Sequence, residues 1–321
     1  AWIVFAAPHL AGHRLWEVPP YLDDDVPATE RERLDGALAE VYEEVDRQLG
    51  RVLEALPDDC DVIACSVLGM DVNTSRADLL PGMLTAVLTD TGASRGSFVA
   101  QEETKEPRSA KDSDSGAMWR LRAALSGRAR AQIAAAMPDR LALELTARLE
   151  LRGVDWSTTR AFAHPADNQG YIHLNRAGRE RDGIVEESEA AELIAQIREG
   201  LLDFRDPDGE PAVTSVDEVA DRWQGAAGHR LPDLVVRWRP TSSVSLNALH
   251  SPRFGTVQRQ GYGSGRTGNH TDGDAWAILA PRAGKVRELG RPARVTDIPA
   301  TAAALNEVPL EGLSGEPLIE R

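Results

Sequence analysis

WIVFAAPHLAGH at residues 2–13 joins an apolar run to two histidines, and the fold prediction starts from it. The length and bulk of residues 2–7 predict a buried strand. If the chain turns helical after Pro8, His9 and His13 lie on one helix face because they are four positions apart. Ligands gather at the carboxyl ends of strands in open α/β sheets, and imidazole is a common metal ligand. The pair is therefore a candidate metal site, with two loop histidines bound to backbone as the alternative.

Further along the chain, helical and apolar segments alternate. A capping-box sequence at residues 29–32 precedes one continuous apolar stripe, which predicts a long helix. Residues 61–66 then predict a second buried strand, and the order strand, helix, strand favours a right-handed crossover in a parallel sheet. The stripe consists of Leu34, Leu38, Val41, Val45, Leu49, Val52 and Leu56. Further strands are expected at residues 170–174, 231–238 and 275–280, further helices at 188–204 and from 297, and a turn at 206–209.

The composition restricts the possible partners. The chain of 321 residues carries 36 basic and 51 acidic side chains, a net charge of −15, which disfavours nucleic-acid polymers and anionic membrane surfaces. A small anionic substrate stays possible because a metal ion inverts the local charge. No apolar stretch approaches the roughly 20 residues that span a bilayer. Cys60 and Cys65 are the only cysteines and are interpreted as small core residues in a reducing, cytoplasmic compartment.

A third histidine completes the candidate site. His270 follows the glycine-rich residues 261–268 and precedes the apolar run 275–280. Together with His9 and His13 it would form a three-histidine site with an open position, which is the catalytic pattern for zinc.

Other basic side chains are interpreted more conservatively. Three further histidines are expected to have structural or surface roles: His164, His173 and His250. Three arginines near the glycine-rich stretch are candidates for bidentate phosphate contacts, with solvated loop positions as the alternative: Arg253, Arg259 and Arg266.

Several motifs occur in a fixed order along the chain. They are His9-x-x-x-His13, Ser-Val-Leu-Gly-Met at residues 66–70 and Gly-Asn-His at 268–270, with further segments at 171–175, 178–180, 183–185, 231–234 and 297–301. In this order they resemble the type I phosphodiesterase/nucleotide pyrophosphatase branch of the alkaline phosphatase superfamily. The resemblance implies an α/β fold with a three-layer αβα, mostly parallel sheet. It also implies a single domain over residues 1–321 that lacks its N-terminal part and carries a helical or loop insertion at about 90–155.

The same resemblance implies a reaction and a ligand set. The family uses two metal ions while a Thr or Ser attacks phosphorus. His13 and His270 match ligands of one metal, and His9 stands where the family has Asp. Val67 and Leu68 replace the Asp and His of the second site, and the segment with the nucleophile would precede Ala1.

The expectation is therefore a metal-dependent phosphoester hydrolase, acting on phosphodiesters or nucleotide pyrophosphates. It keeps one zinc site, formed by His9, His13 and His270, and takes a small phosphorylated substrate. Two alternatives stay open: a catalytically degenerate binding or regulatory relative, and a sulfatase-like hydrolase.

Overall fold

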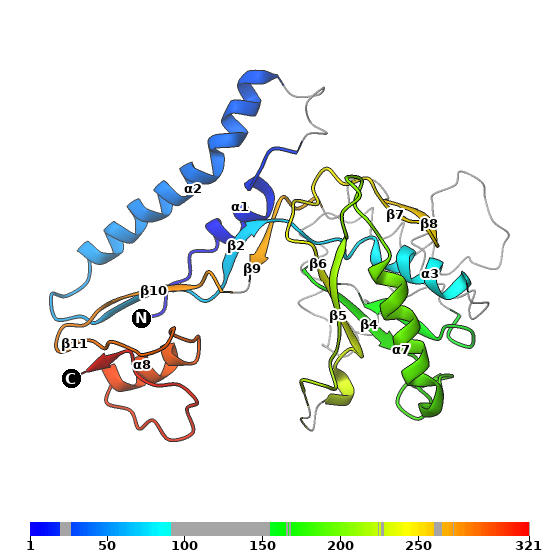
Figure 1. The fold of residues 1–321 in the computed structure, drawn as a ribbon. Coiled ribbons are helices and arrows are strands. Elements are labelled where there is room, and N and C mark those ends of the chain that lie inside the picture. Colours follow the sequence, from blue (N-terminus) through cyan, green and yellow to red (C-terminus); the bar gives the residue numbers. More distant parts are fainter. Residues whose placement is uncertain are drawn as a thin grey trace, which may run out of the picture.

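A computed structural model describes residues 1–19, 27–90, 155–164, 166, 168–223, 225, 228–259, 265–271 and 273–320. Most of the expected insertion at 90–155 lies outside these residues. Figure 1 shows two groups of elements: those of residues 80–90 and 161–258 form one, and those of residues 7–72 and 268–320 form the other.

The hydrophobic core lies between one antiparallel sheet and two helices. The sheet has the strand order β3-β4-β6-β5. Helix α7 (Glu187–Leu202) packs on β5, and α3 (Leu80–Asp90) packs on α7 and β3. Met83, Leu84, Ile172, Ile197 and Val236 are almost completely removed from solvent in this layer. The strands are β3 (Ala161–His164), β4 (Gly170–Leu174), β5 (Val213–Glu218) and β6 (Leu234–Trp238).

The remaining strands form two-stranded antiparallel sheets. They are β1 (Val62–Ser66) with β10 (Trp276–Ala280), β2 (Gly69–Val72) with β9 (Gly268–Thr271), β7 (Ala248–Ser251) with β8 (Gly255–Gln258), and β11 (Lys285–Val286) with β12 (Ile319–Glu320). The other helices are α1 (Ala7–Leu15), α2 (Ala28–Glu54), the 3-10 turn η2 (Gly228–Arg230) and α8 (Asp297–Leu305).

The predicted three-layer, mostly parallel sheet is wrong. Each strand pair in the described residues is antiparallel, and the sheets have only two to four strands. A central parallel strand is covered on both faces, whereas Trp276 and Ile278 of β10 are 52% and 64% exposed. An apolar run has the same composition in either pairing direction, so the sequence pattern could not choose between them.

Two predictions of burial are also wrong. Residues 2–7 form no strand, and Trp2 and Val4 are 85% and 72% exposed because no ladder covers them. Cys60 and Cys65 are free and exposed rather than core residues. Cys65 lies on β1 of the two-stranded β1–β10 sheet, which is too small to enclose its side chain.

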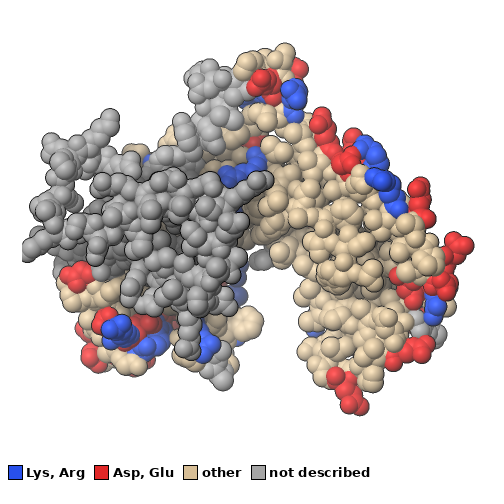
Figure 2. All heavy atoms as spheres, turned by 180° about the vertical axis from the view of Figure 1, so that it is seen from behind, with Lys and Arg blue, Asp and Glu red and all other residues tan. Residues whose placement is uncertain are grey.

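The long helix predicted from the apolar stripe is confirmed as α2. All seven stripe residues are half-buried, and no residue of α2 is fully buried because α1 covers only part of its length. Figure 2 shows acidic and basic side chains along the outer edge of α2, beside a broad uncharged surface. The helix at α7 and the turn at residues 206–209 are confirmed as well, with Gly209 at φ +84°.

The predicted strands at residues 61–66, 170–174, 231–238 and 275–280 occur as β1, β4, β6 and β10. Among the helices that the structure describes, none combines the length and the hydrophobicity of a membrane span.

Two of the sequence motifs meet in one ion-pair cluster. Arg179, in the Gly-Arg-Glu segment, donates through Nη2 to Asp233 Oδ2 at 2.7 Å, and Asp233 belongs to the Leu-Pro-Asp-Leu segment. Asp233 also accepts from the Leu174 amide at 2.7 Å and from Arg176 Nε at 3.0 Å. Burial raises the pKa of Asp233, but these donors outweigh it, so its pKa lies below the ordinary value. The two motifs therefore stabilise the fold.

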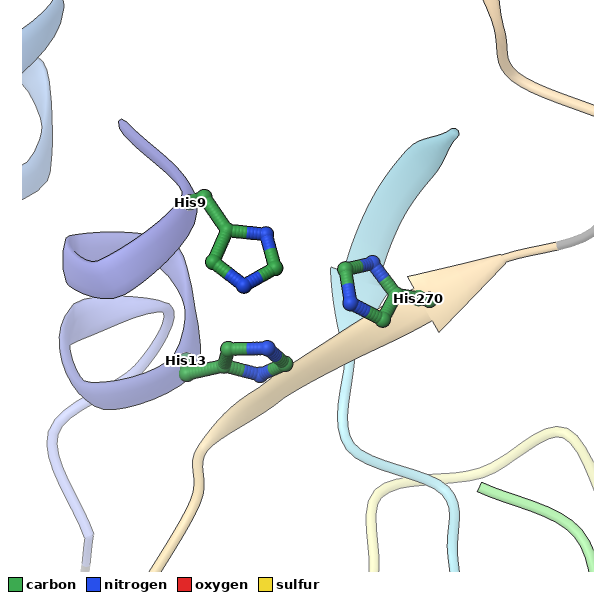
Figure 3. Close-up of side chains that lie close together, drawn as sticks. All are labelled: His9, His13 and His270. Atoms are coloured by element: carbon green, nitrogen blue, oxygen red, sulfur yellow. The ribbon is translucent and has the colours of Figure 1, made fainter. Parts of the chain in front are cut away.

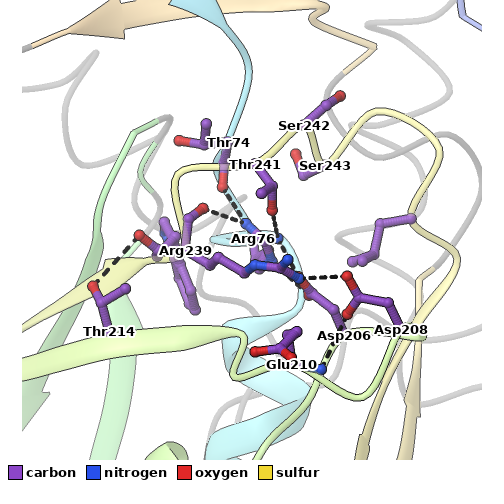
Figure 4. A network of polar contacts seen from close by, with 12 residues as sticks. Thr74, Arg76, Asp206, Asp208, Glu210, Thr214, Arg239, Thr241, Ser242 and Ser243 are labelled. Carbon is purple, nitrogen blue, oxygen red and sulfur yellow. Dashed lines mark hydrogen bonds and ion pairs between the residues drawn. The ribbon is translucent and has the colours of Figure 1, made fainter.

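Arg76 forms a buried ion pair that ties the segment between β2 and α3 to the core (Figure 4). Its side chain is 0% exposed and donates to both carboxylate oxygens of Asp206, at 2.9 and 2.6 Å. The remaining donors reach the carbonyl oxygens of Thr74 and Arg239 and the hydroxyl of Thr241. Such a pair is stable only when every polar atom has a partner, as here.

We expect Arg76→Met to lower the free energy of unfolding by about 3 kcal/mol, because it leaves the Asp206 carboxylate buried with one weaker partner. That partner is Arg239 Nη1, at 3.3 Å. Urea denaturation measures the change. The control is Lys285→Gln, since the Lys285–Glu320 pair is exposed and should contribute little. A loss under about 1 kcal/mol for Arg76→Met would contradict the prediction.

His173 should make stability depend on pH. Its ring stacks on Phe162 with centroids 5.4 Å apart, and burial lowers the pKa of His173 below the ordinary value. In the unfolded chain the pKa of His173 is about 6.5. As the pH drops below that value, the unfolded chain binds a proton that the folded chain does not bind. The free energy of unfolding therefore decreases until the pH passes the folded pKa. In His173→Gln, denaturation midpoints should fall less than in the wild type between about pH 7 and pH 5. Identical pH profiles would show that His173 does not contribute.

Candidate metal centre

Three histidines from two elements converge at one point (Figure 3). His9 and His13 project from one face of α1, which has Pro8 in its first turn, where proline is tolerated, and His270 projects from β9. The ring centroids are 4.8 Å apart for His9 and His13, 5.0 Å for His9 and His270, and 4.9 Å for His13 and His270. One potential ligand atom from each ring lies within 4.8 Å of the others. The structure thus brings together the three residues selected from the sequence.

Gly268 allows α1 to lie directly against β9. A Cβ atom at Gly268 would lie 2.2 Å from the carbonyl oxygen of Gly12 and 2.9 Å from Cβ of Trp16. Both distances are shorter than van der Waals contact, so the helix and the strand meet backbone to backbone. This close approach brings the imidazole of His270 within reach of the two on α1.

Hydrogen bonds fix this contact on both sides of His270. The Thr267 amide donates to the His13 carbonyl oxygen at 2.9 Å, and the Trp16 amide donates to Thr267 Oγ1 at 3.0 Å. On the other side, Nδ2 of Asn168 donates to the His270 carbonyl oxygen at 3.0 Å. The backbone that carries the ligands is therefore held in place.

His13 is oriented for ligation through Nε2. Its Nδ1 lies 3.0 Å from the carbonyl oxygen of Gly268; because a carbonyl only accepts, Nδ1 carries the proton and Nε2 keeps its lone pair. Burial lowers the pKa of His13, and the positive charge of Arg266 acts in the same direction, while the Gly268 bond opposes them. The neutral imidazole that results is the form that binds metals.

The cluster fits one metal ion after a small contraction. Nitrogen ligands about 2.05 Å from a tetrahedral zinc ion are about 3.3 Å apart, compared with separations of up to 4.8 Å here. Rotation of the exposed His9 ring and the half-buried His270 ring can close this difference. No Cys, Asp or Glu of the described residues joins the group, so a three-coordinate protein site would leave a position open.

Val67 and Leu68, which the resemblance expected in place of the second metal's ligands, offer no donor atoms. Val67 and Leu68 are 50% and 52% exposed in the turn between β1 and β2. Ser66 donates through Oγ to the Leu68 carbonyl oxygen at 2.7 Å, so its hydroxyl is engaged in that turn.

The remaining candidates have structural or surface contacts. His164 and His173 are neighbours on β3 and β4, with ring centroids 5.8 Å apart, and His250 Nδ1 lies 3.1 Å from Thr256 Oγ1. Arg259 pairs with Asp78 at 2.7 Å and Arg253 with Glu199 at 3.5 Å. Arg266 is the candidate arginine whose charge acts on His13. Residues 260–264 of the glycine-rich stretch lie outside the described residues.

A separate cavity of about 580 Å³ lies between the loop after β4 and the loop that joins β5 to β6. Trp223, His229 and Leu231 line it, together with the Arg176 and Arg179 side chains that pair with Asp233. None of the three clustered histidines lines this cavity, so the candidate metal centre is a different site.

The sequence interpretation missed the residues that support the cluster. Gly12 and Met70 lie within the sequence motifs but have no predicted role there, and Asn168 lies in none of the motifs. A glycine between two histidines on a helix face was the available signal, because it permits a close approach. The contacts of Asn168 depend on tertiary structure and left no signal in the sequence.

Comparisons of the chain with protein families, with curated proteins and with solved structures found no match.

We expect Gly268→Ala to abolish zinc binding, because the added methyl group would push β9 away from α1 and separate His270 from His9 and His13. Isothermal titration with Zn²⁺ measures the effect. Gly36→Ala is the matched control, since a Cβ atom at Gly36 on α2 meets nothing within 4 Å. Unchanged zinc affinity in Gly268→Ala would show that the backbone contact does not assemble the site.

Proposed function

We propose that this protein binds one zinc ion through His9, His13 and His270 and uses it to hydrolyse a small phosphorylated substrate. The observation that carries the proposal is the convergence of three imidazoles from residues far apart in the sequence. Three protein ligands with a free position are the pattern of catalytic rather than structural zinc sites.

The ligands in this set have different roles. His13 is the buried, pre-oriented ligand, since Gly268 fixes its tautomer. His9 is exposed and leaves one side of the cluster open to solvent, so a substrate can approach there. When bound, zinc supplies Lewis-acid chemistry, polarising a phosphoryl oxygen and lowering the pKa of water.

Positive charge around the cluster supports an anionic substrate. Arg266 lies next to Thr267, whose amide contacts His13, and Arg14 donates through Nη1 to the Gly265 carbonyl oxygen at 2.8 Å. The positive charge of Arg266 therefore acts on the site in a protein whose net charge is −15. It favours a phosphoryl group over a neutral ester.

A second candidate function is metal-dependent binding without catalysis. Val67 and Leu68 favour it, because the resemblance implies a second metal site at these positions and neither side chain can coordinate a metal. In this role the zinc site would hold a phosphorylated ligand without turning it over.

The experiment measures metal content and hydrolysis in the same samples. Protein stripped of metal is reloaded with zinc, and elemental analysis should find about one equivalent. Chromogenic phosphodiester, phosphomonoester and sulfate ester substrates then report activity. Replacing His9, His13 and His270 together by Asn should remove the zinc and lower hydrolysis of the phosphoesters by at least about 100-fold. The control is His250→Asn on β7, which lies outside the cluster.

Each outcome decides between the candidates. Stoichiometric zinc with phosphoester hydrolysis that the triple variant lacks supports the hydrolase. Stoichiometric zinc without turnover supports the binding function, and turnover of the sulfate ester alone supports the sulfatase alternative. Less than about a tenth of an equivalent of zinc refutes both zinc-dependent functions.

A further inference from the structure

Met70 lies beside the three histidines, on the strand that pairs with β9. It stands directly opposite His270 in the antiparallel ladder between β2 and β9. Side chains at directly opposite positions of such a ladder project from the same face. Since the His270 ring faces α1 and its two histidines, the Met70 side chain also faces α1.

The thioether contacts the histidine-bearing face of α1. A Cβ atom at Gly12 would lie 2.3 Å from Sδ of Met70, 3.3 Å from its Cε and 3.7 Å from its Cγ. Residues i, i+3 and i+4 share one face of a helix, so Gly12 lies on the same face as His9 and His13. The absent side chain at position 12 leaves the space that the sulfur fills.

The donors around this point are all uncharged. Three imidazoles and a thioether contribute no negative charge, and no Cys, Asp or Glu of the described residues joins the cluster. Thioether sulfur is a soft donor that selects Cu(I), while imidazole binds both copper and zinc. Four neutral donors suit a monovalent, soft ion, especially beside the positive charge of Arg266.

We propose that Met70 is a fourth ligand of this site and that the resulting His₃Met set binds Cu(I). The inference rests on the histidine cluster of the proposed function and extends its ligand chemistry. With zinc, which does not favour thioether ligands, the three imidazoles bind and the fourth position stays open. With Cu(I), Met70 closes that position. Methionine can make this change because its side chain has three rotatable bonds.

The test compares Cu(I) and Zn²⁺ binding in Met70→Leu, a substitution that keeps the apolar volume. Competition with a chromogenic Cu(I) chelator under anaerobic, reducing conditions gives the Cu(I) affinity, and titration gives the zinc affinity. We expect Met70→Leu to weaken Cu(I) binding at least about tenfold and to leave zinc affinity unchanged. X-ray absorption at the copper edge should show a sulfur neighbour in the wild type and none in the variant. Met83→Leu is the control, since Met83 is a buried core residue of α3.

Three results would overturn the inference: Cu(I) affinity equal in wild type and Met70→Leu, equal losses of Cu(I) and zinc in that variant, or a wild-type copper spectrum without sulfur. Equal losses would assign Met70 to packing against Gly12. If zinc binds stoichiometrically, the zinc hydrolase proposal still stands when the two Cu(I) affinities are equal or when the copper spectrum shows no sulfur. Conversely, Met70-dependent Cu(I) binding in a protein that fails to bind zinc would support the inference and refute the proposed function.

Discussion

The buried pair of Arg76 and Asp206 joins the two parts of this protein. It fixes the segment between β2 and α3 against the core, because a buried charge deprived of its partner destabilises a fold by several kcal/mol. Three residues earlier, Asn73 binds the chain that leads into β9. Its backbone N–H donates to the Thr267 carbonyl oxygen at 2.8 Å, and its side-chain Nδ2 donates to the Arg266 carbonyl oxygen at 3.0 Å. The position of β9, and with it the candidate metal centre, therefore depends on the same short segment that anchors α3.

The geometry of the metal centre follows from a backbone contact more than from the histidines themselves. Gly268 lets β9 touch α1, and the bond from His13 Nδ1 to the Gly268 carbonyl oxygen orients the most buried ring. The other two rings are less enclosed and can adjust to an ion. A rigid backbone with adjustable side chains suits metal binding, since the ligands must be near their final positions but the last ångström can come from ring rotation.

The neutrality of the ligands gives the proposals a common basis. Without a carboxylate, a bound ion keeps its full positive charge, and Arg266 adds to it. With a divalent ion the site would attract a phosphoryl group, and with a monovalent soft ion it would favour the thioether of Met70. Both expectations rest on the same contacts between α1, β2 and β9.

The sequence alone determined the local elements: the half-buried stripe of α2, the helix α7, the turn at residues 206–209, and two histidines on one helix face. These features depend on residues within a few positions of each other, and helical periodicity or turn chemistry encodes them directly. The sequence also identified His270 as a candidate ligand, but it did not determine that His270 lies close to His13. Only the tertiary structure brings these residues together, because the hydrogen bond from His13 Nδ1 to the Gly268 carbonyl oxygen joins residues 255 positions apart. It also decided that β1 and β10 pair antiparallel and that residues 2–7 stay exposed, because an apolar run records only its hydrophobicity and not which strand, if any, lies beside it.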